Sequence, residues 1–162
     1  SENEFLVTHG ADYTVAHRLN DGSELWRLGG LNPKGRYNAR LRFVSSPVAT
    51  PGVIVIPSAK GRGVVGLKPS ATGLILPGNK GEQWRLTRGT PDVVSPLIYG
   101  KEVYLNRENG SITCLDAATG EEQCRPLVRD PEMTFRDRTR YGGSLSAPAT
   151  ERDACPSRGG DI

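Results

Sequence analysis

Short apolar segments alternate with polar positions along the first part of the chain, and glycine or proline separates them. Residues 53–59 and 63–68 form one pair of such segments, and residues 102–108 and 111–117 form another. Alternation with a period of two residues predicts β-strands. Asn109-Gly110 lies between the strands of the second pair and predicts a two-residue hairpin turn, because both positions can take a positive φ. Residues 5–10, 13–19 and 24–28 show the same alternation, so we expect short antiparallel strands here too.

A dipeptide ending in proline marks the start of three similar segments. Ser46-Pro47, Ser95-Pro96 and Ala147-Pro148 each begin a short apolar stretch, at intervals of 49 and 52 residues. Internal similarity at a fixed interval is typical of repeat architectures. We therefore treat the chain as a series of related units.

A turn of small residues and a large residue after it form two further markers of the repeat. The turn ends at Gly22, Gly73 and Gly120 in successive copies. Four positions after the glycine stands Trp26 in the first copy. In the second copy Trp84 is delayed by an insertion around residues 74–83, and in the third copy the position is Cys124.

Four short strands per repeat predict an all-β fold built from the blades of a β-propeller. A closed propeller has at least four blades, so we expect an open arc with exposed edges, a fragment of a ring whose first inner strand would precede Ser1. The predicted organisation is a partial blade (1–28), a connector (29–43), a blade (44–86), a connector (87–92), a blade (93–127), a connector (128–143), the first strand of another blade (144–150) and an irregular tail (151–162) that resembles a truncation.

The turn of the third repeat carries a family resemblance. Residues 115–124 read LDAATGEEQC, which resembles the tryptophan-docking motif of the pyrroloquinoline-quinone-like (PQQ-like) β-propeller repeat. Asp116, Thr119 and Gly120 match that motif, while Cys114 and Cys124 replace its alanine and tryptophan. The first repeat keeps Gly22 and Trp26 of the motif, with Arg18 at the aspartate position, and the second keeps Trp84. The resemblance covers roughly residues 4–150 and implies that the tryptophans pack between adjacent blades.

The resemblance implies two classes of function. Members without catalytic activity include a propeller lipoprotein of the bacterial outer-membrane assembly machine, whereas catalytic members are quinone-dependent alcohol and glucose dehydrogenases. We favour a non-catalytic scaffold that binds a protein or a ligand and needs no cofactor; the alternative is part of a dehydrogenase that holds PQQ with calcium. Related propellers are commonly exported, which implies a periplasmic or exported location. Expected partners are the remaining blades, or further copies that associate through the open edges.

The composition excludes several other classes of protein. The 162 residues contain 20 Gly and 12 Pro, and no stretch free of both exceeds 11 residues, which argues against helical bundles and doubly wound sheets. The net charge of +3 is too small to indicate nucleic-acid binding. No apolar run is long enough to span a membrane.

Arginines in two connectors are the candidate ligand-binding residues. Connectors that lead into inner strands lie on one face of a propeller, near the mouth of its channel, where guanidinium groups can bind an anionic ligand or an acidic partner segment. The alternative is a set of solvated connectors neutralised by nearby carboxylates. The six residues are Arg36, Arg40, Arg42, Arg136, Arg138 and Arg140.

Other suggestive patterns favour structural roles. Gly61, Gly63 and Gly66 spell a dinucleotide-binding fingerprint, but we place the first two in a hairpin turn, whereas the fingerprint requires a helix. We predict that His9 and His17 lie near a surface turn, and no metal site or catalytic residue is expected. If the turn centres near Ala118, the cysteines at 114 and 124 become diagonal neighbours with free, half-buried thiols.

Overall fold

The structure is a computed structural model that describes residues 4–10, 12–59 and 62–124. Three four-stranded sheets contain nearly all of the regular secondary structure in this part of the chain. In order across each sheet, the first contains β1 (Phe5–His9), β2 (Thr14–Arg18), β3 (Glu24–Leu28) and β7 (Gly73–Ile75). The second contains β4 (Val48–Thr50), β5 (Val53–Pro57), β6 (Val64–Leu67) and β8 (Glu82–Leu86). The third contains β9 (Leu97–Tyr99), β10 (Glu102–Asn106), β11 (Ile112–Asp116) and β12 (Glu122–Cys124).

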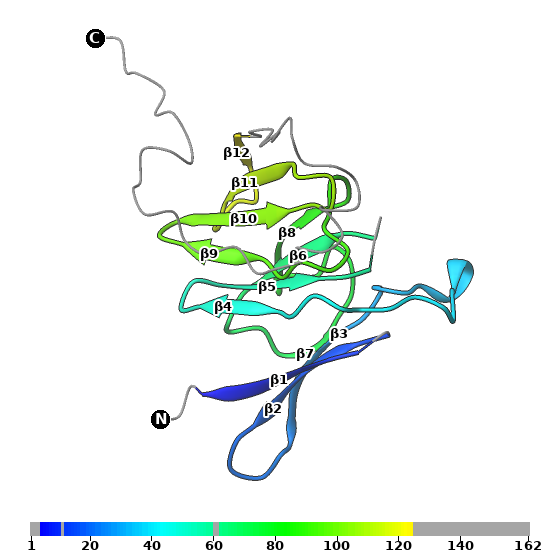
Figure 1. Cartoon of the computed structure of the whole chain (residues 1–162). Coiled ribbons are helices and arrows are strands. Elements are labelled where there is room, and N and C mark those ends of the chain that lie inside the picture. Colours follow the sequence, from blue (N-terminus) through cyan, green and yellow to red (C-terminus); the bar gives the residue numbers. More distant parts are fainter. Residues whose placement is uncertain (1–3, 11, 60–61, 125–162) are drawn as a thin grey trace.

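The three sheets are stacked in sequence order as blades of a partial β-propeller (Figure 1), which confirms the predicted all-β fold. One apolar core lies between the first and second sheets and another between the second and third. The inner strands β4 and β9 lie next to each other. A single short 3-10 helix, η1 (Lys34–Arg36), interrupts the connector between the first two blades in the described residues.

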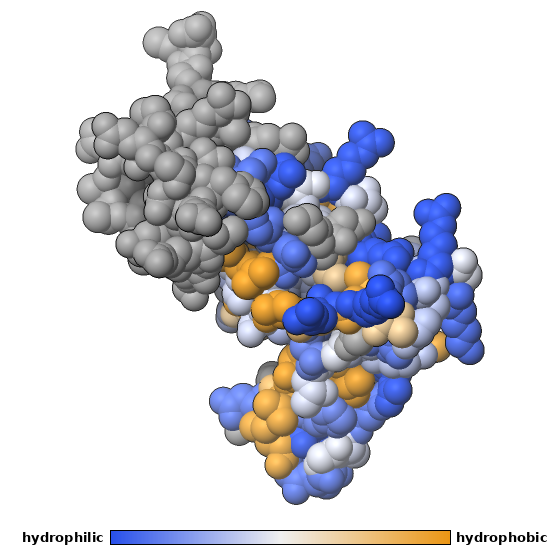
Figure 2. All heavy atoms as spheres, turned by 45° about the vertical axis from the view of Figure 1, so that its right-hand side comes forward, coloured by the Kyte–Doolittle hydropathy of each residue, from blue (hydrophilic) through white to orange (hydrophobic). Residues whose placement is uncertain are grey.

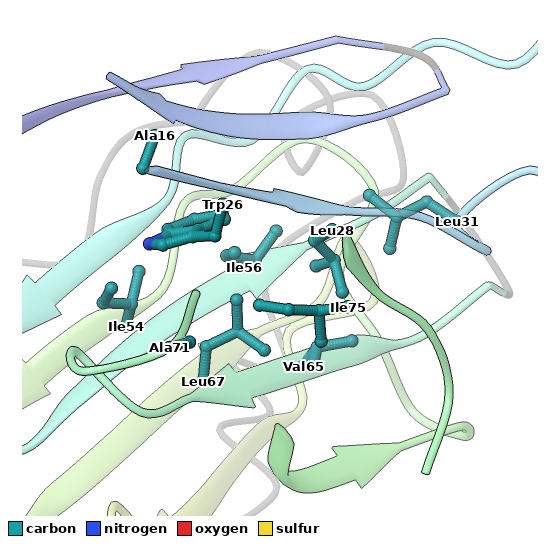
Figure 3. Packing of buried hydrophobic residues seen from close by; sticks show 10 residues of the cluster. All are labelled: Ala16, Trp26, Leu28, Leu31, Ile54, Ile56, Val65, Leu67, Ala71 and Ile75. Atoms are coloured by element: carbon teal, nitrogen blue, oxygen red, sulfur yellow. The ribbon is translucent and has the colours of Figure 1, made fainter. Parts of the chain in front are cut away.

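The second sheet is buried on both faces, which explains its unbroken apolar strands. Ile54 and Ile56 of β5 point into the core shared with the first blade, whereas Val53 and Val55 point into the core shared with the third. Successive side chains of a strand alternate between the two faces of the sheet. A strand between two blades therefore needs apolar residues at every position. Figure 3 shows how the first of these cores closes around Trp26.

The same irregularity interrupts the outer strand pairing in all three blades. The register shifts after Ala16, after Gly66 and after Cys114. Directly across the strands, these three residues face Trp26, Trp84 and Cys124 respectively. Each shift is a β-bulge type of irregularity that brings a small residue opposite the large docking position.

The bulge corrects the predicted placement of the two cysteines. Cys114 lies directly opposite Cys124, whereas counting back from a turn at Ala118 made them diagonal neighbours. That count assumed regular pairing about Ala118. The turn is instead closed by the bond from the Asp116 N–H to the Glu121 carbonyl, which moves the pairing by one position, and the extra residue at the bulge moves it by one more. Cys114 is free and fully buried, so its thiol is not half-exposed as predicted. Cys155 lies outside the described residues.

The turn between β10 and β11 is longer than the predicted two-residue turn. Gly110 has a φ of 78°, but Asn109 keeps a negative φ. The Asn109 side chain instead accepts hydrogen bonds from Ser111, from its backbone N–H at 3.1 Å and from its hydroxyl at 2.7 Å. An asparagine side chain that bonds the backbone two residues ahead stabilises a tight turn without a left-handed backbone.

The insertion before Trp84 forms a strand that belongs to the neighbouring blade. After the turn that ends at Gly73, the chain runs parallel to β3 as β7, with Gly73 opposite Trp26 and Ile75 opposite Leu28. It then returns as β8 to complete the second blade. The insertion therefore adds an outer strand to the first blade, which the sequence pattern did not predict.

Candidate ligand-binding face of the connectors

In the described residues, the two connectors between blades lie at one end of the sheets, together with the β1–β2, β5–β6 and β10–β11 turns. This arrangement follows from antiparallel pairing, in which successive turns alternate between the two ends. We call this end the connector face; in the described residues it comprises residues 10, 12–13, 29–47, 58–59, 62–63, 87–96 and 107–111. The connector with η1 extends well beyond the sheets (Figure 1).

Asn32 holds the first connector in shape. It is only 8% exposed, and its amide nitrogen donates to the Asn38 carbonyl at 3.1 Å and to Asp12 at 3.3 Å. Its amide oxygen accepts from the Asn38 N–H at 3.1 Å. Asn38 in turn accepts from the backbone N–H of Arg40 at 2.9 Å. One buried amide thus fixes the loop that carries the arginines.

Further hydrogen bonds join the connectors and turns into one surface. The Ser46 N–H donates to the Ser95 hydroxyl at 2.9 Å, which links equivalent positions of two successive repeats. Arg62 donates to the Arg36 carbonyl at 3.2 Å and ties the turn of the second blade to the first connector. The Glu108 carboxylate accepts a hydrogen bond from the Asp92 backbone N–H at 2.6 Å, which ties the β10–β11 turn of the third blade to the second connector.

The structure places three of the six predicted arginines on this face. Arg36, Arg40 and Arg42 lie on the first connector and are exposed, and none of them forms an ion pair with another described residue. Arg136, Arg138 and Arg140 lie outside the described residues. In Figure 2 the molecule is turned so that the connector face comes forward, and long hydrophilic side chains project from this part of the surface.

Basic side chains outnumber acidic ones on the described part of the connector face. Two of the acidic residues already accept hydrogen bonds from the loops, Asp12 from Asn32 and Glu108 from the backbone of the second connector. The opposite end is mixed, with Arg18, Lys68 and Lys101 among its basic residues and Asp21 and Glu121 among its acidic residues. On the connector face the basic residues are Lys34, Arg36, Arg40, Arg42, Arg62, Arg88 and Arg107, and the acidic residues are Asp12, Asp92 and Glu108.

Sequence reasoning missed Arg62 and Asn32 as parts of this face. Arg62 stands inside the glycine-rich segment that resembled a nucleotide fingerprint, and that segment leads through Gly66 into strand β6 and not into a helix. Asn32 lies among loop residues with no periodic pattern. Only the contacts in three dimensions show that these residues order the arginines.

His9 lies where the first connector meets the first blade. Its Nδ1 lies 2.6 Å from the Thr14 hydroxyl oxygen, and its ring packs edge-on against Phe43 with centroids 5.2 Å apart. Burial lowers the pKa of the His9 imidazole below its ordinary value. His17 lies on the next strand, and its Nε2 lies 3.3 Å from the Thr8 hydroxyl. Within the described residues, no three His, Cys, Asp or Glu side chains gather closely enough to hold a metal ion.

The docking motif predicted from residues 115–124 is present and joins the second and third blades. The Asp116 carboxylate accepts the backbone N–H groups of Ala118 at 2.9 Å and Thr119 at 2.8 Å. These bonds, that of Thr119 first, hold the pKa of Asp116 below its ordinary value. The Trp84 indole N–H donates to the Ala117 carbonyl at 2.9 Å, and its ring lies against Gly120.

Cys114 and Tyr104 form a buried polar group on the face of the third sheet opposite its core. The Tyr104 hydroxyl donates to the Glu102 carboxylate. Burial raises the pKa of the Cys114 thiol to about 11 and also raises the pKa of Tyr104. Both groups are therefore neutral at physiological pH, which suits a structural role.

The stacked four-stranded sheets and the tryptophan docked on the next blade define a class of repeat β-propellers. No family model matches the chain, and a search among curated proteins finds no match. Among solved structures, similar folds include BamB from Moraxella catarrhalis, at 16% identity and a TM-score of 0.51 over 76% of this chain and 33% of that one. They also include quinohemoprotein alcohol dehydrogenase from Comamonas testosteroni, at 17% identity and a TM-score of 0.54 over 83% of this chain and 21% of that one. A europium-containing methanol dehydrogenase matches at 14% identity and a TM-score of 0.53, over 75% of this chain and 22% of that one.

The chain thus shares its β-propeller fold with these solved structures, which include the two kinds of protein that the resemblance of the docking motif implied. It spans about a third or less of the length of these solved structures. The similar structures include both BamB and dehydrogenases, so the fold is common to proteins of different function. Among the described residues, no helix is long and apolar enough to cross a membrane.

Proposed function

We propose that this protein is a non-catalytic binding scaffold, and that its connector face binds an acidic segment of a partner protein. The observation that carries the proposal is the set of exposed guanidinium groups at Arg36, Arg40 and Arg42, none of them paired with another described residue. Guanidinium groups bind carboxylates in a planar, two-point geometry. Asn32 holds the loop in a defined shape, so less order is lost when a partner binds.

Two features favour a peptide over a small anion. The arginines lie along an extended connector, so their charges are spread over a length of chain and do not converge on one point. Binding sites for small ligands are concave and enclose most of the ligand. A surface of spaced cations fits an extended acidic segment, and its binding will weaken as salt screens the charges.

The test compares binding of a fluorescein-labelled octaglutamate peptide to three proteins by fluorescence anisotropy. The variant Arg36→Gln/Arg40→Gln/Arg42→Gln should lose at least tenfold in affinity, and 0.5 M salt should remove binding to the unchanged protein. The control Lys68→Gln/Lys80→Gln/Lys101→Gln carries the same change in charge on exposed residues at the other end. Equal losses in both variants would show that net charge alone attracts the peptide, which would refute a site on the connector face.

The alternative function is part of a PQQ-dependent dehydrogenase, for which the similar structures include catalytic members. Titration with PQQ and calcium while Trp26 and Trp84 fluorescence is followed separates the two functions. Saturable quenching that requires both the quinone and calcium would replace the scaffold proposal. Quenching that does not saturate would support it.

A further inference from the structure

An apolar residue recurs at an exposed position just before two inner strands. Val44 and Val93 each stand three residues before the proline that opens the strand, at the 49-residue interval of the repeat. Val44 is 53% exposed and Val93 is 44% exposed, and both lie on the connector face where the chain enters β4 and β9. Leu145 stands at the same place before Pro148, outside the described residues.

Packing within the protein does not explain why this position is apolar in both repeats. The same interval of 49 residues relates Ile54 to Val103 and Ile56 to Leu105, and these four side chains are buried in the cores between blades. An apolar side chain stabilises the fold through the surface that it buries, so a half-exposed one contributes little. Single exposed apolar residues are common, but one that recurs at an exposed position of a repeat indicates a surface that contacts another molecule.

Hydrogen bonds hold the two valines in neighbouring places on the connector face. The Ser45 hydroxyl donates to the Asp92 carbonyl at 3.3 Å, and the Ser46 N–H donates to the Ser95 hydroxyl at 2.9 Å. The two valines directly adjoin residues that are linked in this way. We therefore treat Val44 and Val93 as one apolar surface, the valine pair, which extends from the second blade to the third.

The charge beside the valine pair differs between its two ends. Exposed and covered residues alternate over 41–46, so Arg42 and Val44 lie on the same side of the connector. Two carboxylates lie at the other end, because Asp92 precedes Val93 in the chain and Glu108 accepts the Val93 N–H at 3.2 Å. An acidic segment that covers the valine pair would therefore keep its own carboxylates on the Arg42 side.

We propose that the partner segment carries large apolar side chains among its acidic ones. The apolar side chains would cover Val44 and Val93, while neighbouring carboxylates would bind Arg42 and the other exposed arginines of the first connector. This inference rests on the proposed function and specifies the chemistry of its partner. A purely acidic segment would use the arginines and leave the valine pair in water.

The test compares two fluorescein-labelled peptides of equal charge, EEFEEFEE and EEQEEQEE, by fluorescence anisotropy. The phenylalanine peptide should bind the unchanged protein about fivefold more tightly than the glutamine peptide, because only phenylalanine gains from covering apolar surface.

Two double variants locate the source of this difference. Val44→Ser/Val93→Ser should bring the two affinities within about twofold of each other and leave the affinity for the glutamine peptide unchanged. The control Leu19→Ser/Leu74→Ser removes two equally exposed apolar side chains away from the connector face, and it should keep the full difference. The variant Arg36→Gln/Arg40→Gln/Arg42→Gln should weaken the binding of both peptides.

The results separate a failure of this inference from a failure of the proposed function. Equal affinities of the two peptides for the unchanged protein would overturn the inference, and so would an equal loss of the difference in both double variants. In either case, arginine-dependent binding of the glutamine peptide would still support an acidic partner. If neither peptide binds, the proposed function is wrong and the inference fails with it.

Discussion

Gly66 offers the sharpest test of how the blades are held together. It lies in β6 opposite Trp84, and a Cβ added to it would lie 2.3 Å from the indole Cε2 and 2.5 Å from Nε1. Contacts below 3.0 Å do not occur, so Gly66→Ala must displace the indole. The displaced ring would lose its hydrogen bond to the Ala117 carbonyl of the third blade.

The expected destabilisation follows from three contributions. Overpacking of a tight core costs about 1–3 kcal/mol, and loss of the hydrogen bond costs about 0.5–1.5 kcal/mol. Replacing a strand glycine by alanine stabilises the fold by about 0.5–1 kcal/mol, because alanine loses less backbone conformational entropy on folding. The free energy of unfolding should therefore fall by about 0.5–4 kcal/mol, the opposite of the usual effect of this substitution.

Urea unfolding followed by tryptophan fluorescence and circular dichroism measures this change. The control is Gly52→Ala, at an exposed turn where an added Cβ meets no atom within 4 Å and φ is not positive. This control should be unchanged or more stable by up to about 1 kcal/mol. If Gly66→Ala unfolds at the same urea concentration as Gly52→Ala, the indole does not lie on Gly66 and the docking contact described above is wrong.

Three further outcomes are expected. Because burial lowers the pKa of folded His9, the folded protein favours the neutral ring; the resulting stability is present above the unfolded pKa of about 6.5 and is lost as the pH falls below it. The melting temperature should therefore fall between pH 7.5 and 5.5, and less so in His9→Gln; an equal fall in both would assign the effect to other groups. Asp116→Ala removes the acceptor of two backbone N–H groups and should cost about 1–2 kcal/mol in urea unfolding, whereas Glu121→Ala in the same turn should cost less than about 0.5 kcal/mol. Cys114, with a buried thiol whose pKa is about 11, should resist iodoacetamide at pH 8 in the folded protein and react in urea, as read by peptide mass spectrometry; rapid labelling without urea would show that the thiol is exposed.

The strands and their grouping into blades could be predicted from the sequence because they depend on local patterns. Short apolar segments at 53–59 and 102–108 mark where strands lie, and the repeated turns mark where they end. The docking turn could also be predicted, since Asp116 bonds backbone groups only two and three residues ahead. These interactions lie within one repeat and need no knowledge of the neighbouring blade.

Other features depend on contacts between distant residues and could not be predicted in this way. The register shift beside Cys114 becomes visible only when the facing strand is in place. The position of β7 depends on the outer edge of β3, whose paired residues lie 47 positions earlier in the chain. Arg36, Arg40 and Arg42 could be proposed from their clustering, but the role of Asn32 in ordering them requires the folded loop.

The parallel pairing of β7 with β3 means that the repeats of this protein are not interchangeable parts. In a simple repeat array, each unit contacts its neighbours only through side chains, and units can be duplicated or exchanged at their boundaries. Here a strand encoded within the second repeat shares backbone hydrogen bonds with the first. A junction placed between these repeats would strip the first sheet of its outer strand. Any exchange of repeats, by evolution or by design, must therefore keep residues 4–86 together as one unit.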